Sequence, residues 1–271
     1  MLGLACGWVV LWPSALMPIL GLTFALAALS LLDDMRGLSR SLRLCLQIAA
    51  AAAFIALRPT LPGGLLGAAA AALAVAWMTN VFNFMDGANG LAGGMALFGF
   101  GFYAVAAWLG GAPALGGAAL CAAAAAGGFL WFNFDPARIF MGDAGSIPLG
   151  FLAAALGLAG WQEGIWPLGF PVLVFSPFIV DASATMALRL LRGEKFWQAH
   201  REHYYQRLVR LGLGHRRVAL AEYGLMLACG ASALALLLAS SQAQTVILLV
   251  WCALYGLVMF AVDRVWGRYN A

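Results

Sequence analysis

Three polar side chains recur at helical spacing in a segment that is otherwise apolar. Asn80, Asn83 and Asp86 are each three residues apart, so they share one face of a helix. Gly87 and Gly90 follow, break that helix and allow close approach of the backbone. Amide and carboxylate oxygens suit a hard divalent cation or a polar head group. This segment predicts such a binding site; the alternative is a helix end with scattered polar residues.

A second acidic side chain stands among small residues between 132 and 146. Gly142 and Gly145 flank Asp143 and free backbone amides near an expected helix start, which is a typical setting for binding an anionic group. Asp143 would repel a phosphate there, and a divalent cation between the two resolves the conflict. We therefore expect Asp143 to bind a metal ion. Asp135 is interpreted as a turn residue before Pro136.

Two adjacent carboxylates, Asp33 and Asp34, end an apolar segment and are followed by Arg36, Arg40 and Arg43. Neighbouring residues on a helix point about 100° apart. The two carboxylates are therefore expected to have different roles. The alternative is a polar helix stop with a solvated run of charges.

A long basic loop, residues 188–218, contains the remaining candidate groups. His200 and His203 are three residues apart, and Arg207 follows one turn later. Zinc binding is possible in principle, but the loop has no Cys and no second pair of histidines to complete a site. Phosphate binding by the His and Arg side chains fits better, and a basic loop attracted to anionic lipid is the alternative. Asp181, inside an apolar segment, is either a structural hydrogen-bond partner or part of the site.

The elements that position these residues are membrane helices. Of 271 residues, 64% are hydrophobic and 10% are charged, against roughly 25% charged residues in a soluble domain. Long unbroken apolar runs exclude a transmembrane barrel, in which polar and apolar residues alternate. The net charge of +4 reflects arginines in loops, not nucleic-acid binding. We predict an all-α polytopic integral membrane protein, with residues 1–271 forming one domain.

About 20 apolar residues are needed to cross the hydrocarbon core. This length predicts about nine spans, near residues 15–32, 42–57, 64–82, 92–109, 113–132, 146–160, 165–187, 219–239 and 245–263. Residues 2–12 are apolar but too short to span. Of the 15 Lys and Arg residues, 14 lie in or beside alternate connections, which the positive-inside rule assigns to the cytoplasm.

Nearly all of the 11 acidic residues lie at the same cytoplasmic ends of the predicted helices. Transporters typically carry ionisable groups near the bilayer midplane. Carboxylates at one interface fit a cytoplasmic catalytic face better, with one substrate in the cytosol and another in the membrane. A non-catalytic lipid or solute transporter is therefore less favoured. An intramembrane Mg²⁺-dependent prenyltransferase would need a second Asp-x-x-x-Asp motif that the sequence lacks.

Taken in chain order, these four stretches resemble the polyprenyl-phosphate N-acetylhexosamine-1-phosphate transferases of glycosyltransferase family 4. That family includes phospho-N-acetylmuramoyl-pentapeptide transferase. The matching pieces are Asp33-Asp34, Asn80-x-x-Asn83-x-x-Asp86-Gly87-x-x-Gly90-Leu91, Phe140-Met141-Gly142-Asp143-x-Gly145-Ser146 and the histidine-containing loop. The loop looks most like the branch that initiates O-antigen synthesis. It lacks the consecutive histidines of the cell-wall branch.

The resemblance implies a bacterial inner-membrane enzyme that transfers an amino-sugar 1-phosphate from a UDP-amino-sugar to undecaprenyl phosphate and releases UMP. It implies Mg²⁺ or Mn²⁺ as cofactor, and a homodimer is left open. Family members usually begin with another helix, a basic loop and a second helix. We therefore expect about 50–70 further residues, enough for two spans and a loop, to be encoded in frame upstream of Met1.

Each candidate residue then has an expected role. We expect Asp143, Asp86 and Asn83 to hold the metal ion, and Asp33, Asp34 and Asp86 to be catalytic. Asp33 or Asp34 would deprotonate the lipid phosphate; direct attack and a covalent aspartyl intermediate are both open. By resemblance, Phe140, Asn133 and Asn89 border the uracil. Substrate-binding residues also include Asn80, Arg138, His200, His203 and Arg207.

Overall fold

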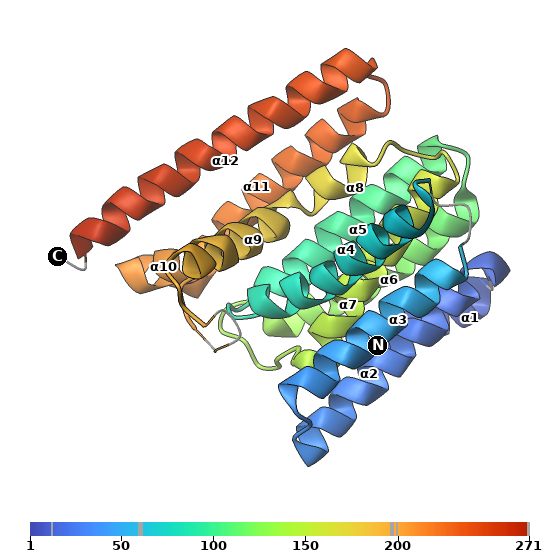
Figure 1. The fold of residues 1–271 in the computed structure, drawn as a ribbon, viewed down its shortest axis with the longest axis horizontal. Coiled ribbons are helices and arrows are strands. Elements are labelled where there is room, and N and C mark those ends of the chain that lie inside the picture. Colours follow the sequence, from blue (N-terminus) through green and yellow to red (C-terminus); the bar gives the residue numbers. More distant parts are fainter. Residues whose placement is uncertain (12, 59–61, 196–197, 199, 270–271) are drawn as a thin grey trace.

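The computed structural model describes residues 1–11, 13–58, 62–195, 198 and 200–269, and these residues form helices without a strand (Figure 1). The first half of the chain contains α1 (Leu2–Leu11), a short 3₁₀ turn (Ser14–Leu16), α2 (Met17–Arg36), α3 (Arg40–Ala56), α4 (Gly64–Met85), α5 (Leu91–Leu109) and α6 (Pro113–Asn133). The second half contains α7 (Asp143–Gln162), α8 (Gly169–Val174), α9 (Ser176–Leu191), α10 (Tyr204–Leu208), a π-helical turn (Val209–Leu213), α11 (Gly214–Leu236) and α12 (Ser241–Tyr269). The predicted all-α class is confirmed.

In the part of the chain that the structure describes, seven helical segments are long and apolar enough to cross a bilayer. The predicted count of about nine is not confirmed. Of the two remaining predicted spans, 42–57 corresponds to α3, which has 17 residues. The other, 165–187, is divided at Phe175 into α8 and α9. Pro177 in the first turn of α9 lacks the N–H that a continuous helix would need there.

Helix α7 lies between α2 and α4, whereas α5 packs against α6 and α11. The approach of α7 to α4 depends on Gly150. A Cβ at this position would lie 2.5 Å from the carbonyl oxygen of Met78 and 2.8 Å from Cα of Thr79. Because no Cβ is present, the two backbones come close together. The end of α4 is thereby held beside the start of α7.

Successive helices run up and down, so alternate connections meet at one end of the bundle. The α2–α3 turn, the start of α7, helix α10 and the C-terminal end of α12 lie toward the lower left of Figure 1. These segments carry four of the 11 acidic and six of the 15 basic side chains. Arg58 and Glu163 are at the opposite end, where Nη1 and Oε1 are 3.5 Å apart.

Candidate active site

Helices α2, α3 and α7 bring three charged side chains together. Nη1 of Arg43 donates to Oδ2 of Asp33 at 2.9 Å and to Oδ2 of Asp143 at 3.0 Å. Asp33 is buried, and its other carboxylate oxygen accepts from the backbone N–H of Leu38 at 2.7 Å. Arg43 therefore joins two of the predicted site residues. Asp34 is exposed, so the two adjacent carboxylates are in different environments, as their helical spacing predicts.

The polar face of α4 meets the start of α7. The side chain of Asn83 lies beside the carboxylate of Asp143, and its Oδ1 accepts from the hydroxyl of Ser146 at 3.2 Å. The backbone amide of Gly142 lies near the carboxyl group of Asp86. Gly142 has φ +60°, a left-handed conformation that glycine adopts without a steric penalty. All three predicted metal-binding residues, Asn83, Asp86 and Asp143, thus come together.

The environment of Asp86 disfavours its charge. Burial, followed by repulsion from Asp143, raises the pKa of Asp86 to about 7, although the Gly142 N–H opposes this shift. A carboxyl group with this pKa is about half protonated at neutral pH. A cation placed between Asp86 and Asp143 would relieve the repulsion.

Within the described residues, no group of three or more His, Cys, Asp and Glu side chains forms a metal site. Two carboxylates and one amide, all with hard oxygen donors, are present in the cluster of Asn83, Asp86 and Asp143. This set fits Mg²⁺, which is commonly bound through one or two carboxylates with substrate phosphates and water completing the octahedron. The donors and the mutual repulsion of the two carboxylates therefore fit a divalent cation.

Asn80, one turn before Asn83, contacts α3. Its Nδ2 donates to Oε1 of Gln47 and to the backbone oxygen of Ala76, both at 2.8 Å. Gln47 is buried and lies one turn after Arg43. The pair fixes α3 against α4, and substrate binding by Asn80 stays a prediction.

The loops after α4 and α6 are tied together by their amides. Asn133 is buried; its Oδ1 accepts from the N–H of Gly90 at 3.0 Å and its Nδ2 donates to the backbone oxygen of Ile139 at 2.8 Å. Asn89 donates to Oδ1 of Asp135 at 2.8 Å, so Asp135 has a partner beyond its own turn. These contacts hold the loop before Asp143 against the start of α5.

Two of the predicted substrate-binding side chains on that loop are open to solvent. Arg138 is exposed, and 76% of the surface of Phe140 is accessible. An exposed aromatic ring can stack on a nucleobase. Their predicted contacts with substrate are not tested by these positions.

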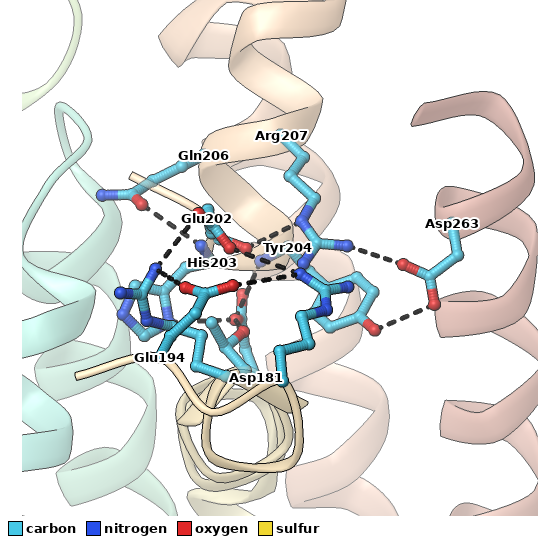
Figure 2. A network of polar contacts seen from close by, with 11 residues as sticks. Asp181, Glu194, Glu202, His203, Tyr204, Gln206, Arg207 and Asp263 are labelled. Atoms are coloured by element: carbon cyan, nitrogen blue, oxygen red, sulfur yellow. Dashed lines mark hydrogen bonds and ion pairs between the residues drawn. The ribbon is translucent and has the colours of Figure 1, made fainter. Parts of the chain in front are cut away.

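The histidine-containing segment is anchored by Asp181 of α9 (Figure 2). The Asp181 carboxylate accepts from the backbone N–H groups of Tyr204 and Tyr205, both at 2.9 Å, and lies 3.3 Å from Nδ1 of His203. A carboxylate at the first N–H groups of a helix is favourable because those groups lack intrahelical partners. Of the two interpretations left open for Asp181, the hydrogen-bonding one describes its contacts.

Helix α10 also touches the end of α4. His203 is buried and stacks on Phe84, with ring centroids 6.1 Å apart and an interplanar angle of 24°. The hydroxyl of Tyr205 donates to the backbone oxygen of Phe84 at 3.1 Å. The predicted histidine loop and the predicted asparagine–aspartate motif are therefore in contact, two residues before Asp86.

His200 and Arg207 differ in their surroundings. Burial, followed by the nearby charges of His203 and Arg189, lowers the pKa of His200 to about 4. The imidazole is therefore neutral at pH 7. Arg207 is buried and pairs with Asp263 of α12, with Nη1 and Oδ1 2.6 Å apart. Its predicted role in substrate binding stays a prediction.

A cleft of about 700 Å³ opens between this segment and the turn after α4. Its lining includes two exposed arginines and a histidine. The lining residues are Gly87, Arg201, Tyr205, Gln206, Val209, Arg210 and His215. Nδ1 of His215 accepts from the N–H of Asn89 at 3.3 Å, and no role was predicted for this histidine. The cleft has the charge and size for an anionic ligand.

Among the residues in these contacts that were given no role from the sequence are Arg43, Gln47, Asp263 and His215. Arg43 and Gln47 are polar, four residues apart, in a largely apolar helix, so their shared face was a usable signal. Asp263 is the acidic residue of the last predicted span, 245–263. Its partner, 56 positions earlier, could not be inferred from spacing.

Comparison with known proteins identifies the family of this chain. The sequence model of glycosyl transferase family 4 matches residues 16–160. The matched residues include the Asp33-Asp34 pair, the α4 motif and the start of α7. The chain belongs to this family. The resemblance noted in the sequence is thus confirmed.

Curated relatives of this family-4 chain are bacterial phospho-sugar transferases. A probable undecaprenyl-phosphate N-acetylglucosaminyl 1-phosphate transferase of Bacillus subtilis is 31% identical over 214 residues, 74% of this chain and 60% of the relative. A phospho-N-acetylmuramoyl-pentapeptide-transferase of Bifidobacterium longum is 44% identical over 108 residues, 34% of this chain and 29% of the relative. One from Staphylococcus saprophyticus is 33% identical over 132 residues, 48% of this chain and 40% of the relative. The matches therefore span at most about three fifths of these relatives.

Proposed function

We propose that this protein transfers a sugar 1-phosphate from a nucleotide sugar to a polyprenyl phosphate. The observation that carries the proposal is the cluster of Asp33, Arg43, Asn83, Asp86 and Asp143 at the end of apolar helices. A membrane-embedded phosphate and a soluble diphosphate can meet at such an end. Both substrates are anions, so positioning and charge neutralisation dominate the chemistry.

The finer assignment extends the same proposal. The donor is a UDP-amino-sugar, the acceptor is undecaprenyl phosphate, and the enzyme works in the bacterial inner membrane with its site facing the cytoplasm. The Bacillus relative carries undecaprenyl phosphate and N-acetylglucosamine in its name. The distribution of arginines supports the orientation. Initiation of O-antigen or another envelope polysaccharide is the use proposed for the product.

In the proposed reaction, an oxygen of the lipid phosphate attacks the phosphorus that carries the sugar. The bond from this phosphorus to the bridging oxygen breaks, and UMP leaves with that oxygen. Asp34, which is exposed, is proposed to accept the proton of the lipid phosphate, whose second pKa is about 6. Asp33 is held by Arg43 and keeps that guanidinium directed at Asp143.

Asn83, Asp86 and Asp143 would hold Mg²⁺ or Mn²⁺, which when bound would neutralise and orient the diphosphate oxygens. The Arg43 guanidinium supplies a second fixed positive charge at the same place. Arg201 and Arg210 line the cleft beside Gly87, at the turn after α4. Their positive charges give an anionic nucleotide sugar a favourable place to bind.

Purified protein, undecaprenyl phosphate and a panel of UDP-sugars test the proposal, with UMP release and the lipid product as readouts. We expect turnover with a UDP-N-acetyl-amino-sugar and none without the lipid phosphate. Release of UMP in the absence of lipid phosphate would indicate hydrolysis and contradict the transfer. A complete lack of reaction with every UDP-sugar would contradict the proposed donor class.

A further inference from the structure

The last helix, α12, has a polar contact with the histidine-containing segment. Most of its side chains are exposed; only Tyr255 and Val262 are buried. Asp263 follows Val262 near the charged end of the bundle. Its two carboxylate oxygens accept from different side chains of α10: Oδ1 from Arg207 at 2.6 Å and Oδ2 from the hydroxyl of Tyr204 at 3.1 Å. Figure 2 shows α12 approaching α10 through this carboxylate.

Arg207 is the buried partner in this pair. The exposed fraction of its side chain is 3%, whereas that of Asp263 is 45%. Nε of Arg207 donates to the backbone oxygen of Glu202 at 2.7 Å, and the guanidinium lies over the Tyr204 ring, 4.6 Å from its centroid. Among the described residues, Asp263 is the carboxylate that is ion-paired with Arg207. Loss of that charge would leave a buried cation uncompensated, which is strongly unfavourable.

The same short helix continues to the candidate active site. Tyr205, next to Tyr204, donates to the backbone oxygen of Phe84, and His203 stacks on the Phe84 ring. Asp86 lies two residues beyond Phe84. A chain of direct contacts therefore runs from Asp263 through α10 to the end of α4.

From these contacts we infer that Asp263 is a positioning residue: α12 holds α10, and through it His203 and the Phe84–Asp86 turn, in the geometry that the site needs. The inference rests on the proposed function for its effect on catalysis. The placement of α10 is a separate, directly measurable consequence. Asp263 does not touch the carboxylate cluster, so its effect is transmitted by packing.

The full chain in lipid nanodiscs tests the inference with three variants. Asp263→Asn removes the charge, and Asp263→Glu retains it. Glu163→Gln is the matched control, because Glu163 pairs with Arg58 at the opposite end of the bundle. Amide hydrogen exchange over residues 203–210 and 84–90 reports the position of α10 without any substrate. Release of UMP, measured as a function of nucleotide-sugar concentration, reports catalysis.

We expect Asp263→Asn to accelerate exchange in both segments and to lower kcat/KM by roughly tenfold, the scale of a small misplacement of binding groups. Asp263→Glu should restore most of both readouts, and Glu163→Gln should match wild type. Unchanged exchange in Asp263→Asn would overturn the inference, as would equal losses in Asp263→Glu. If exchange responds as expected but wild type releases no UMP with any donor, the positioning role stands and the proposed function fails.

Discussion

Nη1 of Arg43 lies 3.0 Å from Oδ2 of Asp143, and this ion pair joins residues 100 positions apart. The same guanidinium contacts Asp33 at 2.9 Å. One side chain from α3 therefore links the end of α2 to the start of α7. Because the two carboxylates would otherwise face each other, Arg43 is central to the electrostatics of the site.

We predict that Arg43→Gln lowers the rate of UMP release by roughly 100-fold, or about 2.7 kcal/mol of barrier. The loss of the guanidinium leaves Asp33 and Asp143 without their shared cation. The rate of Arg43→Lys should fall between those of wild type and Arg43→Gln, since an ammonium keeps the positive charge but not the fixed geometry of the guanidinium. Arg36→Gln serves as the control, because Arg36 is exposed at the end of α2. Turnover by Arg43→Gln at the wild-type rate would contradict this role.

Asp143→Asn is expected to abolish activity while the protein stays folded in membranes, and excess EDTA should do the same to wild type. The reason is that Asp143, Asp86 and Asn83 meet where a divalent cation would neutralise the diphosphate. Asp135→Asn, which can still accept from Asn89, should keep most of the activity. Full activity in EDTA would rule out the metal assignment.

His200 should remain uncharged at neutral pH. Its pKa is lowered from 6.5 to about 4, mainly by burial. Because the folded-state pKa is below the unfolded value, neutral His200 favours folding fully above pH 6.5, and this contribution is lost as the pH falls from 6.5 toward 4. NMR of histidine-labelled protein, with His200→Gln to assign the signal, measures the value directly. A midpoint near 6.5 would show the prediction to be wrong.

Gly150→Ala should lower the free energy of unfolding by about 2 kcal/mol, since the added Cβ would press on the α4 backbone at Met78 and Thr79. Thermal unfolding in detergent is the measurement. Gly101→Ala provides the comparison in α5, where a Cβ would meet nothing within 4 Å. That change should be neutral or stabilising by about 0.5–1 kcal/mol. Similar effects of the two substitutions would argue against a close α4–α7 contact.

The proposed orientation predicts opposite labelling of two engineered cysteines. In a chain whose five native cysteines are replaced, a cysteine at Lys195 should resist a membrane-impermeant reagent in intact cells, whereas one at Glu163 should react. Arginines cluster at the Lys195 end, and the positive-inside rule assigns that end to the cytoplasm. Reaction at Lys195 and protection at Glu163 would reverse the topology.

The amino-acid sequence alone predicted the all-α class and most spans, because apolar length is a local property. It also singled out the polar face of Asn80, Asn83 and Asp86, since helical spacing alone places these residues together. The division of 165–187 into α8 and α9 was missed, although Pro177 was a local signal for it.

Tertiary structure decided which of these residues meet. Asp33 and Asp34 are adjacent in sequence, yet one is buried against Arg43 and the other is exposed. Arg207 reads as a phosphate-binding residue in its loop, but the fold pairs it with Asp263 on another helix. A helical period specifies the face on which a side chain lies. Its partner on that face depends on how close, and in what register, helices distant in sequence pack, and residues such as Gly150 set this only in the folded chain.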